Sequence, residues 1–219
     1  SFVPISMGDS FHILNALLAP TCSALETEAR PLSVAGSAPV GGVTAAARAW
    51  MEGDFRRSVE IYNAIAIEHP RDLVAIQAAH VIDFYLGNSL MLRDRVAQAL
   101  PNWDETVPGH GYLLGMYAFG LEEMANYPRA EDVGRQALDL NRRDPWAVHA
   151  IQHVFEMQGR VHDGVEWLQS TAPDWQDSAL AFHNWWHLSL HYMEIGEDQA
   201  ALDLYDRVIH PKPTAIALE

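Results

Sequence analysis

The segment Ala147-Val-His-Ala-Ile-Gln-His-Val-Phe-Glu-Met-Gln-Gly159 decides how this chain folds, together with Phe182-His-Asn-Trp-Trp-His-Leu-Ser-Leu-His-Tyr-Met-Glu-Ile-Gly196. Each segment has apolar residues at helical spacing, ends in a glycine and is followed by a second amphipathic stretch. This pattern predicts two helix–turn–helix hairpins. Each first helix also carries a His-x-x-x-His pair, His149/His153 or His183/His187. Residues four apart share one face of a helix, so each pair presents two imidazoles side by side.

The same turn signal recurs along the chain at a nearly constant interval. Gly53 and Gly87 are 34 residues apart, Ala125 and Gly159 are again 34 apart, and Gly196 follows 37 residues later. A period near 34 with helix–turn–helix units is typical of tetratricopeptide repeats (TPR). The sequence therefore predicts an all-α fold, a TPR-like superhelix of antiparallel helical hairpins, in which neighbouring units share a continuous core.

The expected organisation has three parts. Residues 1–43 are predicted to form an N-terminal helix and a loop, residues 44–209 about five hairpins, and residues 210–219 a tail or the start of a further hairpin. First helices are expected at 44–52, 72–86, 111–124, 145–158 and 178–195, and second helices at 55–67, 90–100, 129–140, 162–169 and 198–208.

The composition argues against several classes of partner. The chain of 219 residues has a formal net charge of −15, whereas binding to nucleic-acid phosphates or to an anionic membrane surface needs clustered Lys and Arg. No apolar run approaches the roughly 20 residues of a membrane span. The single cysteine, Cys22, excludes an internal disulfide and a thiolate-rich zinc site, so a reducing, cytoplasmic location is expected.

Several strings in the chain resemble one family of repeat proteins. They are Trp146-Ala-Val-His149-Ala-Ile-Gln-His153-Val-Phe-Glu156-Met157, His183-Asn-Trp-Trp186-His187-Leu-Ser-Leu, His69-Pro-Arg-Asp72, Phe84-Tyr-Leu-Gly87, Met91-Leu-Arg-Asp94 and Gly115-Met-Tyr-Ala-Phe-Gly120-Leu-Glu-Glu. All are similar to the tetratricopeptide repeat protein 38 family. The resemblance covers most of 53–207 and implies a helical-repeat protein, with no established activity attached. Because family members are about twice as long, it also implies that this chain is a fragment, or the ordered part, of a longer protein.

A ligand groove is expected on the first helices, which line the concave side of tetratricopeptide hairpins. The stripe of positions counted back from each turn, together with the neighbouring His187, gives Tyr112, Phe119, Glu122, Trp146, His149, His153, Glu156, His183, Trp186 and His187. The two histidine pairs are expected to point into one shared, largely buried region. His80 and Asp83 are placed within reach of it. Glu122 is followed by Glu123, and such a pair in an acidic chain is more typical of a solvated face.

These residues leave several functions open. The first hypothesis is a scaffold whose His- and Trp-lined groove binds a protein or peptide, with a basic segment favoured by the acidic chain. In the second, His149, His153, His183 and His187 ligate a divalent transition metal or bind a small polar ligand. Glu156 would then be a further ligand or the general base of a metal-dependent enzyme.

Two further readings of the same residues involve no ligand. The four histidines can form a hydrogen-bonded, packed core. Alternatively, the open end of the solenoid can join a second copy of the chain through an apolar face formed by Leu190, Leu202, Tyr205 and Ile209.

Overall fold

The computed structural model describes residues 40–209, and each regular element in that range is a helix. Ten α-helices form five hairpins there, which confirms the predicted all-α repeat fold. The hairpins are α2 (Val40–Met51) with α3 (Phe55–Glu68), α4 (Leu73–Tyr85) with α5 (Ser89–Ala99), α6 (His110–Glu122) with α7 (Tyr127–Leu140), α8 (Pro145–Met157) with α9 (Val161–Trp175), and α10 (Ala181–Glu194) with α11 (Asp198–Leu204). The predicted N-terminal helix, Cys22 and the tail at 210–219 lie outside the described residues.

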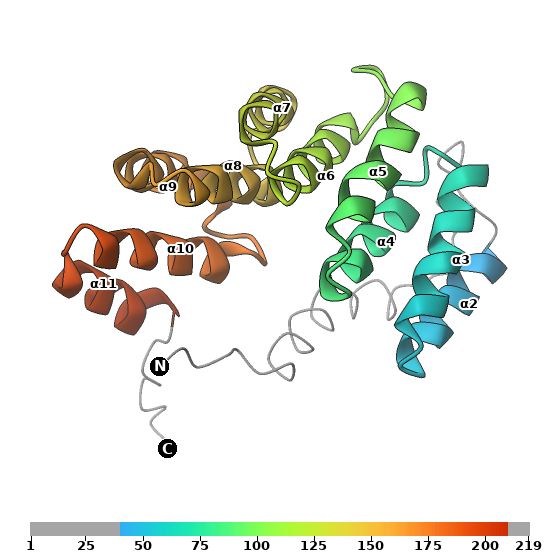
Figure 1. The fold of residues 1–219 in the computed structure, drawn as a ribbon, viewed down its shortest axis with the longest axis horizontal. Coiled ribbons are helices and arrows are strands. Elements are labelled where there is room, and N and C mark those ends of the chain that lie inside the picture. The colour runs from blue at the N-terminus through green and yellow to red at the C-terminus, as the bar shows by residue number, and fades with distance from the viewer. Residues whose placement is uncertain (1–39, 210–219) are drawn as a thin grey trace, which may run out of the picture. The chain divides into compact units, whose positions relative to one another are not determined.

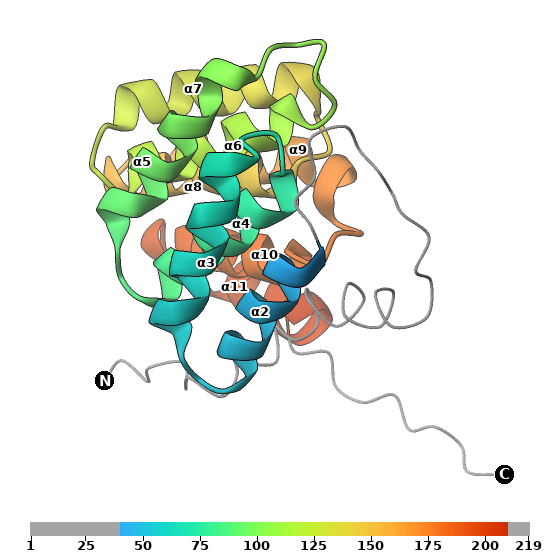
Figure 2. The same ribbon diagram turned by 90° about the vertical axis from the view of Figure 1, so that its right-hand side faces the viewer.

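The hairpins pack on one another in chain order (Figure 1). Helix α6 contacts α5 before it and α8 after it, and α8 in turn contacts α10. Figure 2 shows α2, α3 and α4 side by side at the start of this order. Because each hairpin packs mainly on its sequence neighbours, the first helices α8 and α10 are adjacent, and the two histidine pairs face each other.

The five hairpin turns adopt a left-handed backbone at the residues that the sequence predicts. The φ angle is +81° at Gly53, +67° at Gly87, +66° at Gly159 and +79° at Gly196, a region that glycine enters without a steric penalty. The third turn has a φ of +57° at Ala125, the one non-glycine residue with positive φ among residues 40–209. Ala125 therefore occupies the place of a turn glycine, with a Cβ that disfavours the conformation.

Aspartates begin three of the helices. The side chains of Asp54, Asp72 and Asp144 each accept a hydrogen bond of 3.0 Å from a backbone N–H in the first turn of α3, α4 and α8. These caps satisfy backbone donors that have no partner within the helix. For α8, the cap fixes where the helix that carries His149 and His153 begins.

Some helix boundaries differ from the prediction. Helix α2 begins at Val40 rather than at 44, and α10 begins at Ala181 rather than at 178. Helix α9 continues to Trp175, past the expected end at 169 and with Pro173 inside it. The indole of Trp175 is 1% exposed and donates a 2.9 Å hydrogen bond to the Thr171 hydroxyl. Burial of this large side chain outweighs the one backbone donor that Pro173 lacks.

Small residues bring the helices of the second to fourth hairpins close together. A Cβ on Gly120 of α6 would lie 2.6 Å from the backbone nitrogen of Arg93 in α5. A Cβ on Gly134 of α7 would lie 2.7 Å from the Ile151 side chain in α8. The main apolar core lies around these contacts and includes the buried Phe119. Close backbone approach of this kind fixes α8 firmly against α6 and α7.

The last described hairpin is partly open. Helix α11 is followed by a short π-helical segment, η2 (Tyr205–Ile209). Leu202 is 59% exposed and Tyr205 46% exposed, whereas Leu190 and Ile209 are half-buried. Self-association through this end stays a prediction. None of the helices in the described part of the chain is long and apolar enough to cross a membrane.

Candidate functional site

The four histidines of the two pairs meet between α8 and α10. His149 and His153 come from α8, and His183 and His187 come from α10. One ring nitrogen of each lies within 4.8 Å of those of the other three. The structure thus brings the two pairs together in one region, as expected, rather than packing them in separate layers.

The Nε2 atoms of the four rings form a chain of short contacts. His149 Nε2 lies 3.0 Å from His183 Nε2, and His183 Nε2 lies 3.1 Å from His187 Nε2. His187 Nε2 lies 3.2 Å from His153 Nε2. A contact between two ring nitrogens is a hydrogen bond only when one carries a proton and the other a lone pair. The same four nitrogens are also a ligand set of the type that transition metals take.

Two carboxylates lie against the outer nitrogens of these rings. His187 Nδ1 is 2.9 Å from Glu156 Oε2, and His153 Nδ1 is 3.4 Å from Glu122 Oε2. Glu122 is only 5% exposed, so the prediction of a solvated Glu122-Glu123 face is wrong for Glu122. The last turn of α6 is covered because nearly the whole helix is buried, and Glu122 therefore faces α8 rather than water.

Burial keeps most of this cluster neutral. His149 is 4% exposed and His187 is 3% exposed. Burial, reinforced by repulsion from the other imidazoles, lowers the pKa of His149 well below its usual range and the pKa of His183 to about 3. Burial also lowers the pKa of His187, against the hydrogen bond to Glu156. That hydrogen bond lowers the pKa of Glu156, so its carboxylate is ionised near neutral pH. Neutral imidazole is the form that ligates metal ions.

Aromatic rings surround the histidines. The Phe119 ring centroid lies 5.5 Å from that of His149 and 5.7 Å from that of His153. Trp146 lies 5.9 Å from His149, and Trp186 lies 5.5 Å from His183. This apolar setting limits the water around the ring nitrogens and strengthens electrostatic interactions among them.

The ten residues predicted to line a groove lie at two levels. Tyr112 and Glu156 are exposed, and Trp146, His153, His183 and Trp186 are half-buried at the surface. Phe119, Glu122, His149 and His187 are buried beneath them; this agrees with the largely buried region predicted for the histidines and differs from the groove lining predicted for Phe119 and Glu122. Close packing of α6 on α8 covers them, since a Cβ on Gly115 would lie only 3.3 Å from the Ala147 Cβ.

Two other residues expected near the groove have different roles. The carboxylate of Asp83 is fully buried and pairs with Arg95 of α5 at 2.5 Å, so it does not reach the histidines. His80 is buried with its ring centroid 5.9 Å from that of Phe119. The expectation failed for Asp83, because this position on α4 faces α5, whereas His80 does reach residues of the predicted groove: it contacts Phe119 and lines a cavity with Tyr112 and Trp146.

Sequence reasoning missed Asp144. Its side chain is fully buried at the start of α8, and Oδ2 has no hydrogen-bond partner among the described residues. Burial raises the pKa of Asp144 to about 7. Together with His80, Tyr112 and Trp146 it lines a cavity of about 30 Å³, which has room for water but not for a substrate. An aspartate before a proline predicts a helix cap, and nothing in that pattern indicates burial.

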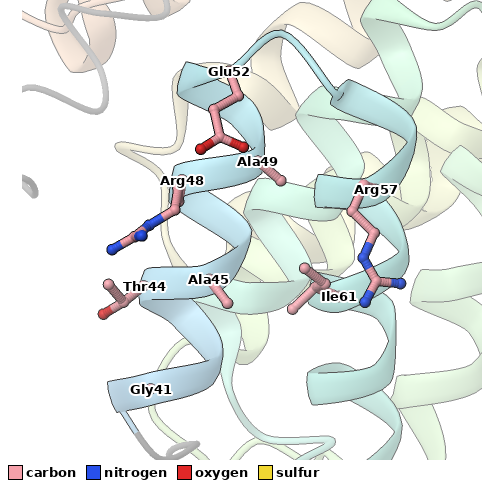
Figure 3. A pocket seen from close by; sticks show the side chains of 8 residues that line it. All are labelled: Gly41, Thr44, Ala45, Arg48, Ala49, Glu52, Arg57 and Ile61. Carbon is pink, nitrogen blue, oxygen red and sulfur yellow. The ribbon is translucent and has the colours of Figure 1, made fainter.

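A larger hollow lies elsewhere, on α2 and α3. Its volume is about 560 Å³, and Figure 3 shows its lining of small and charged side chains: Gly41, Thr44, Ala45, Arg48, Ala49, Glu52, Arg57 and Ile61. It shares no residue with the predicted site. Two groups of side chains in the described part of the chain could hold a metal ion: the four histidines between α8 and α10, and Glu122, Glu123 and His153 beside them.

Comparison with known proteins identifies the fold. No family model matches the chain. A tetratricopeptide repeat protein from Parabacteroides merdae ATCC 43184 is similar with a TM-score of 0.61 and 14% identity, over 91% of this chain and 73% of that one. MamA from Desulfovibrio magneticus RS-1, from position 41 to its end, is similar with a TM-score of 0.55 and 13% identity, over 77% and 91%. TPR-like repeats of a putative kinesin light chain from Podosopora anserina are similar with a TM-score of 0.54 and 16% identity, over 77% of this chain and 92% of that one. The chain thus has a TPR-like helical-repeat fold.

Proposed function

We propose that this protein is a scaffold that binds an extended, basic segment of a partner protein on its first helices. The binding region is the first-helix surface, defined by Phe84, Tyr112, Trp146, His153, Glu156, His183 and Trp186. The observation that carries the proposal is a continuous network of aromatic and imidazole rings from α4 to α10. Repeat proteins of this fold commonly present one extended surface to a partner, and that analogy supports the proposal.

The ring network links four helices without a break. Phe84 of α4 is 46% exposed, and its ring centroid lies 5.7 Å from that of Phe119 in α6. Phe119 lies 5.5 Å from His149 of α8, which lies 4.8 Å from His183 of α10. Half-exposed rings such as Tyr112, at 47%, add large contact area at a small cost in side-chain entropy. Such a surface suits a partner segment that runs across several helices.

Charge favours a basic partner. The chain carries a net charge of −15, and Glu156 places an ionised carboxylate on the first-helix surface. Tryptophan and tyrosine rings attract Lys and Arg side chains through cation–π contacts. Opposite charge also speeds association and makes it sensitive to salt.

A peptide array tests this proposal. Immobilised peptides that vary in Lys/Arg content should retain the protein increasingly as that content rises, whereas matched Asp/Glu peptides should not. Raising the salt concentration should weaken the retention. Truncation of an aromatic residue in a binding interface typically costs about 1–2 kcal/mol of binding free energy. Tyr112→Ala should therefore weaken binding of the best basic peptide about 5- to 30-fold.

The matched control is Tyr205→Ala on η2. Tyr205 has almost the same exposure as Tyr112, 46% against 47%, but lies outside the first-helix surface. Its replacement should leave peptide binding unchanged. Equal retention of basic and acidic peptides, or an equal effect of both substitutions, would rule out this binding surface.

We further infer a relationship to the tetratricopeptide repeat protein 38 family, which rests on the strings around Trp146 and His183. A cytoplasmic location remains part of this proposal and rests on the single cysteine and the acidic composition.

A further inference from the structure

The hydrogen bonds of the outer nitrogens decide which ring atoms carry protons. His187 Nδ1 lies 2.9 Å from Glu156 Oε2, and a carboxylate oxygen accepts a hydrogen bond, so Nδ1 carries the proton and Nε2 carries a lone pair. His153 Nδ1 lies 3.4 Å from Glu122 Oε2, a buried carboxylate oxygen that has no hydrogen-bond partner among the described residues. A carboxylate on one nitrogen of an imidazole is the usual way in which proteins orient the other nitrogen as a metal ligand.

This tautomer of His187 conflicts with a purely hydrogen-bonded cluster. His187 Nε2 lies 3.2 Å from His153 Nε2 and 3.1 Å from His183 Nε2, yet its one lone pair can accept a hydrogen bond from only one of them. His183 Nε2 is within 3.1 Å of both His187 Nε2 and His149 Nε2, yet a neutral ring has at most one proton there to share. His149 Nδ1 is buried and has no hydrogen-bond partner within residues 40–209. A packed polar core would leave these groups poorly satisfied.

The separations match those of nitrogens around one metal ion. With metal–nitrogen bonds of about 2.0–2.1 Å, two corners of a tetrahedron are about 3.3–3.4 Å apart and two adjacent corners of an octahedron about 2.8–3.0 Å. Three of the six Nε2–Nε2 separations among the four rings, 3.0, 3.1 and 3.2 Å, fall between these values. Ordinary stacking of imidazole rings does not require these distances, because stacked rings need not bring their Nε2 atoms together.

We propose that His149, His153, His183 and His187 bind one divalent transition-metal ion, with Zn²⁺ as its representative, between α8 and α10. All four ligands are imidazoles, which suit Zn²⁺, Ni²⁺, Cu²⁺ and Co²⁺ and not the oxygen-seeking Mg²⁺ or Ca²⁺. The Glu156 and Glu122 carboxylates act through His187 and His153 and offset the charge of the ion. His153 and His183 are half-buried, so an ion can reach the site from the first-helix surface.

The site would link two repeats. Two ligands belong to the fourth hairpin and two to the fifth, so the ion holds α8 against α10. A set of four protein ligands is characteristic of structural zinc sites, whereas catalytic sites usually keep one position for water. The inference is independent of partner binding, because a metal can bind whether or not a peptide does.

Metal titration of the chelator-treated protein tests the inference. Calorimetry with ZnCl₂ should show one saturable site per chain, and MgCl₂ should give none. Co²⁺ should produce the intense visible absorption of a four-coordinate ion and should be displaced by Zn²⁺. His183→Ala should abolish both signals, whereas His162→Ala, at an exposed position of α9, should change neither.

A substitution outside the ligand set keeps the test valid if a histidine variant misfolds. Glu156 is 41% exposed, so Glu156→Gln should fold normally and still weaken Zn²⁺ binding about 10- to 100-fold through His187. Glu166→Gln on the exposed side of α9 is its control and should bind as the unaltered protein does. The absence of a one-to-one Zn²⁺ site, or unchanged affinity in both His183→Ala and Glu156→Gln, would overturn the inference.

Discussion

The two sides of α8 are held in different ways. Toward α6 and α7, contact depends on missing side chains: Gly115 lies against Ala147, and Gly134 lies against Ile151. Toward α10, the contact includes four imidazoles. Their Nε2 atoms form a chain in which each lies 3.0–3.2 Å from the next. The first side is therefore stabilised mainly by close packing, whereas the stability of the second depends on what its nitrogens bind.

Overpacking of the small-residue contacts should give the largest effect. In Gly120→Ala the new Cβ would meet backbone atoms of Leu92 and Arg93 at 2.6 Å, and backbone cannot move aside as a side-chain tip can. We expect a loss of about 3 kcal/mol in the free energy of unfolding, by chemical denaturation, with and without Zn²⁺. Gly41→Ala is the control, because a Cβ there has open space and should cause no loss. A tolerated Gly120→Ala would show that close backbone approach between helices does not decide the stability of this core.

Replacement of His149 should distinguish most clearly between the stability that comes from packing and the stability that comes from the metal ion. His149→Leu removes a buried imidazole whose Nδ1 has no partner within the described range, so the metal-free protein should change by less than about 1 kcal/mol. The unaltered protein should gain about 2.7 kcal/mol at a Zn²⁺ concentration of about 100 times Kd, and the variant should gain nothing. Thermal denaturation with and without Zn²⁺ measures both quantities. Equal stabilisation of both proteins would show that the ion binds elsewhere.

The pH dependence of the metal-free protein should follow the imidazoles. The pKa values of His149, His183 and His187 are lowered in the folded state, so the unfolded chain binds more protons below its ordinary histidine pKa of about 6.5. Stability should therefore be full above about pH 6.5 and fall as the pH decreases, by about 1.4 kcal/mol per pH unit for each proton of difference.

Asp144 affects the pH dependence of stability in the opposite direction from the histidines. Its pKa is raised to about 7, so the protonated form stabilises the fold at low pH, and that contribution is lost as the pH rises toward 7. Denaturation from pH 7 to pH 5 should thus be steeper for Asp144→Asn than for the unaltered protein, and shallower for His183→Gln. A stability that does not change over this range in Asp144→Asn would contradict neutral, buried histidines.

The repeat turns should show the smallest effect and no dependence on metal. Ala125 carries a Cβ at a φ of +57°, so Ala125→Gly should raise the free energy of unfolding by about 0.5–1 kcal/mol. The reverse change, Gly159→Ala, should lower it by about 1 kcal/mol. Zn²⁺ should raise the free energy of unfolding of both variants by the same amount. Urea denaturation resolves changes of this size, and a destabilised Ala125→Gly would mean that the turn does not need glycine.

Much of the fold could be predicted from the sequence because its signals are local. Gly53, Gly87 and Gly159 mark turns by the conformation that glycine allows, and the period near 34 then fixes which helices are neighbours. Adjacent first helices are enough to bring His153 and His187 together. These parts of the prediction need no knowledge of side-chain packing.

The depth of the site could not be predicted in this way. Whether Glu122 is solvated depends on how closely α8 approaches α6, which Gly115 and Gly134 of the third hairpin decide through their contacts with α8. Asp144 gives only a cap signal, although it is fully buried. Burial of polar groups is a property of three-dimensional packing, and the helical period of the sequence does not contain it.

X-ray absorption spectroscopy of the Zn²⁺-loaded protein tests most directly whether four histidines ligate one ion. Ligation by the four histidines should give a first shell of four nitrogens at about 2.0–2.1 Å, with the outer-shell scattering of imidazole rings. In His149→Leu that imidazole scattering should disappear or fall. A first shell dominated by oxygen, or a spectrum unchanged in His149→Leu, would contradict a four-histidine site.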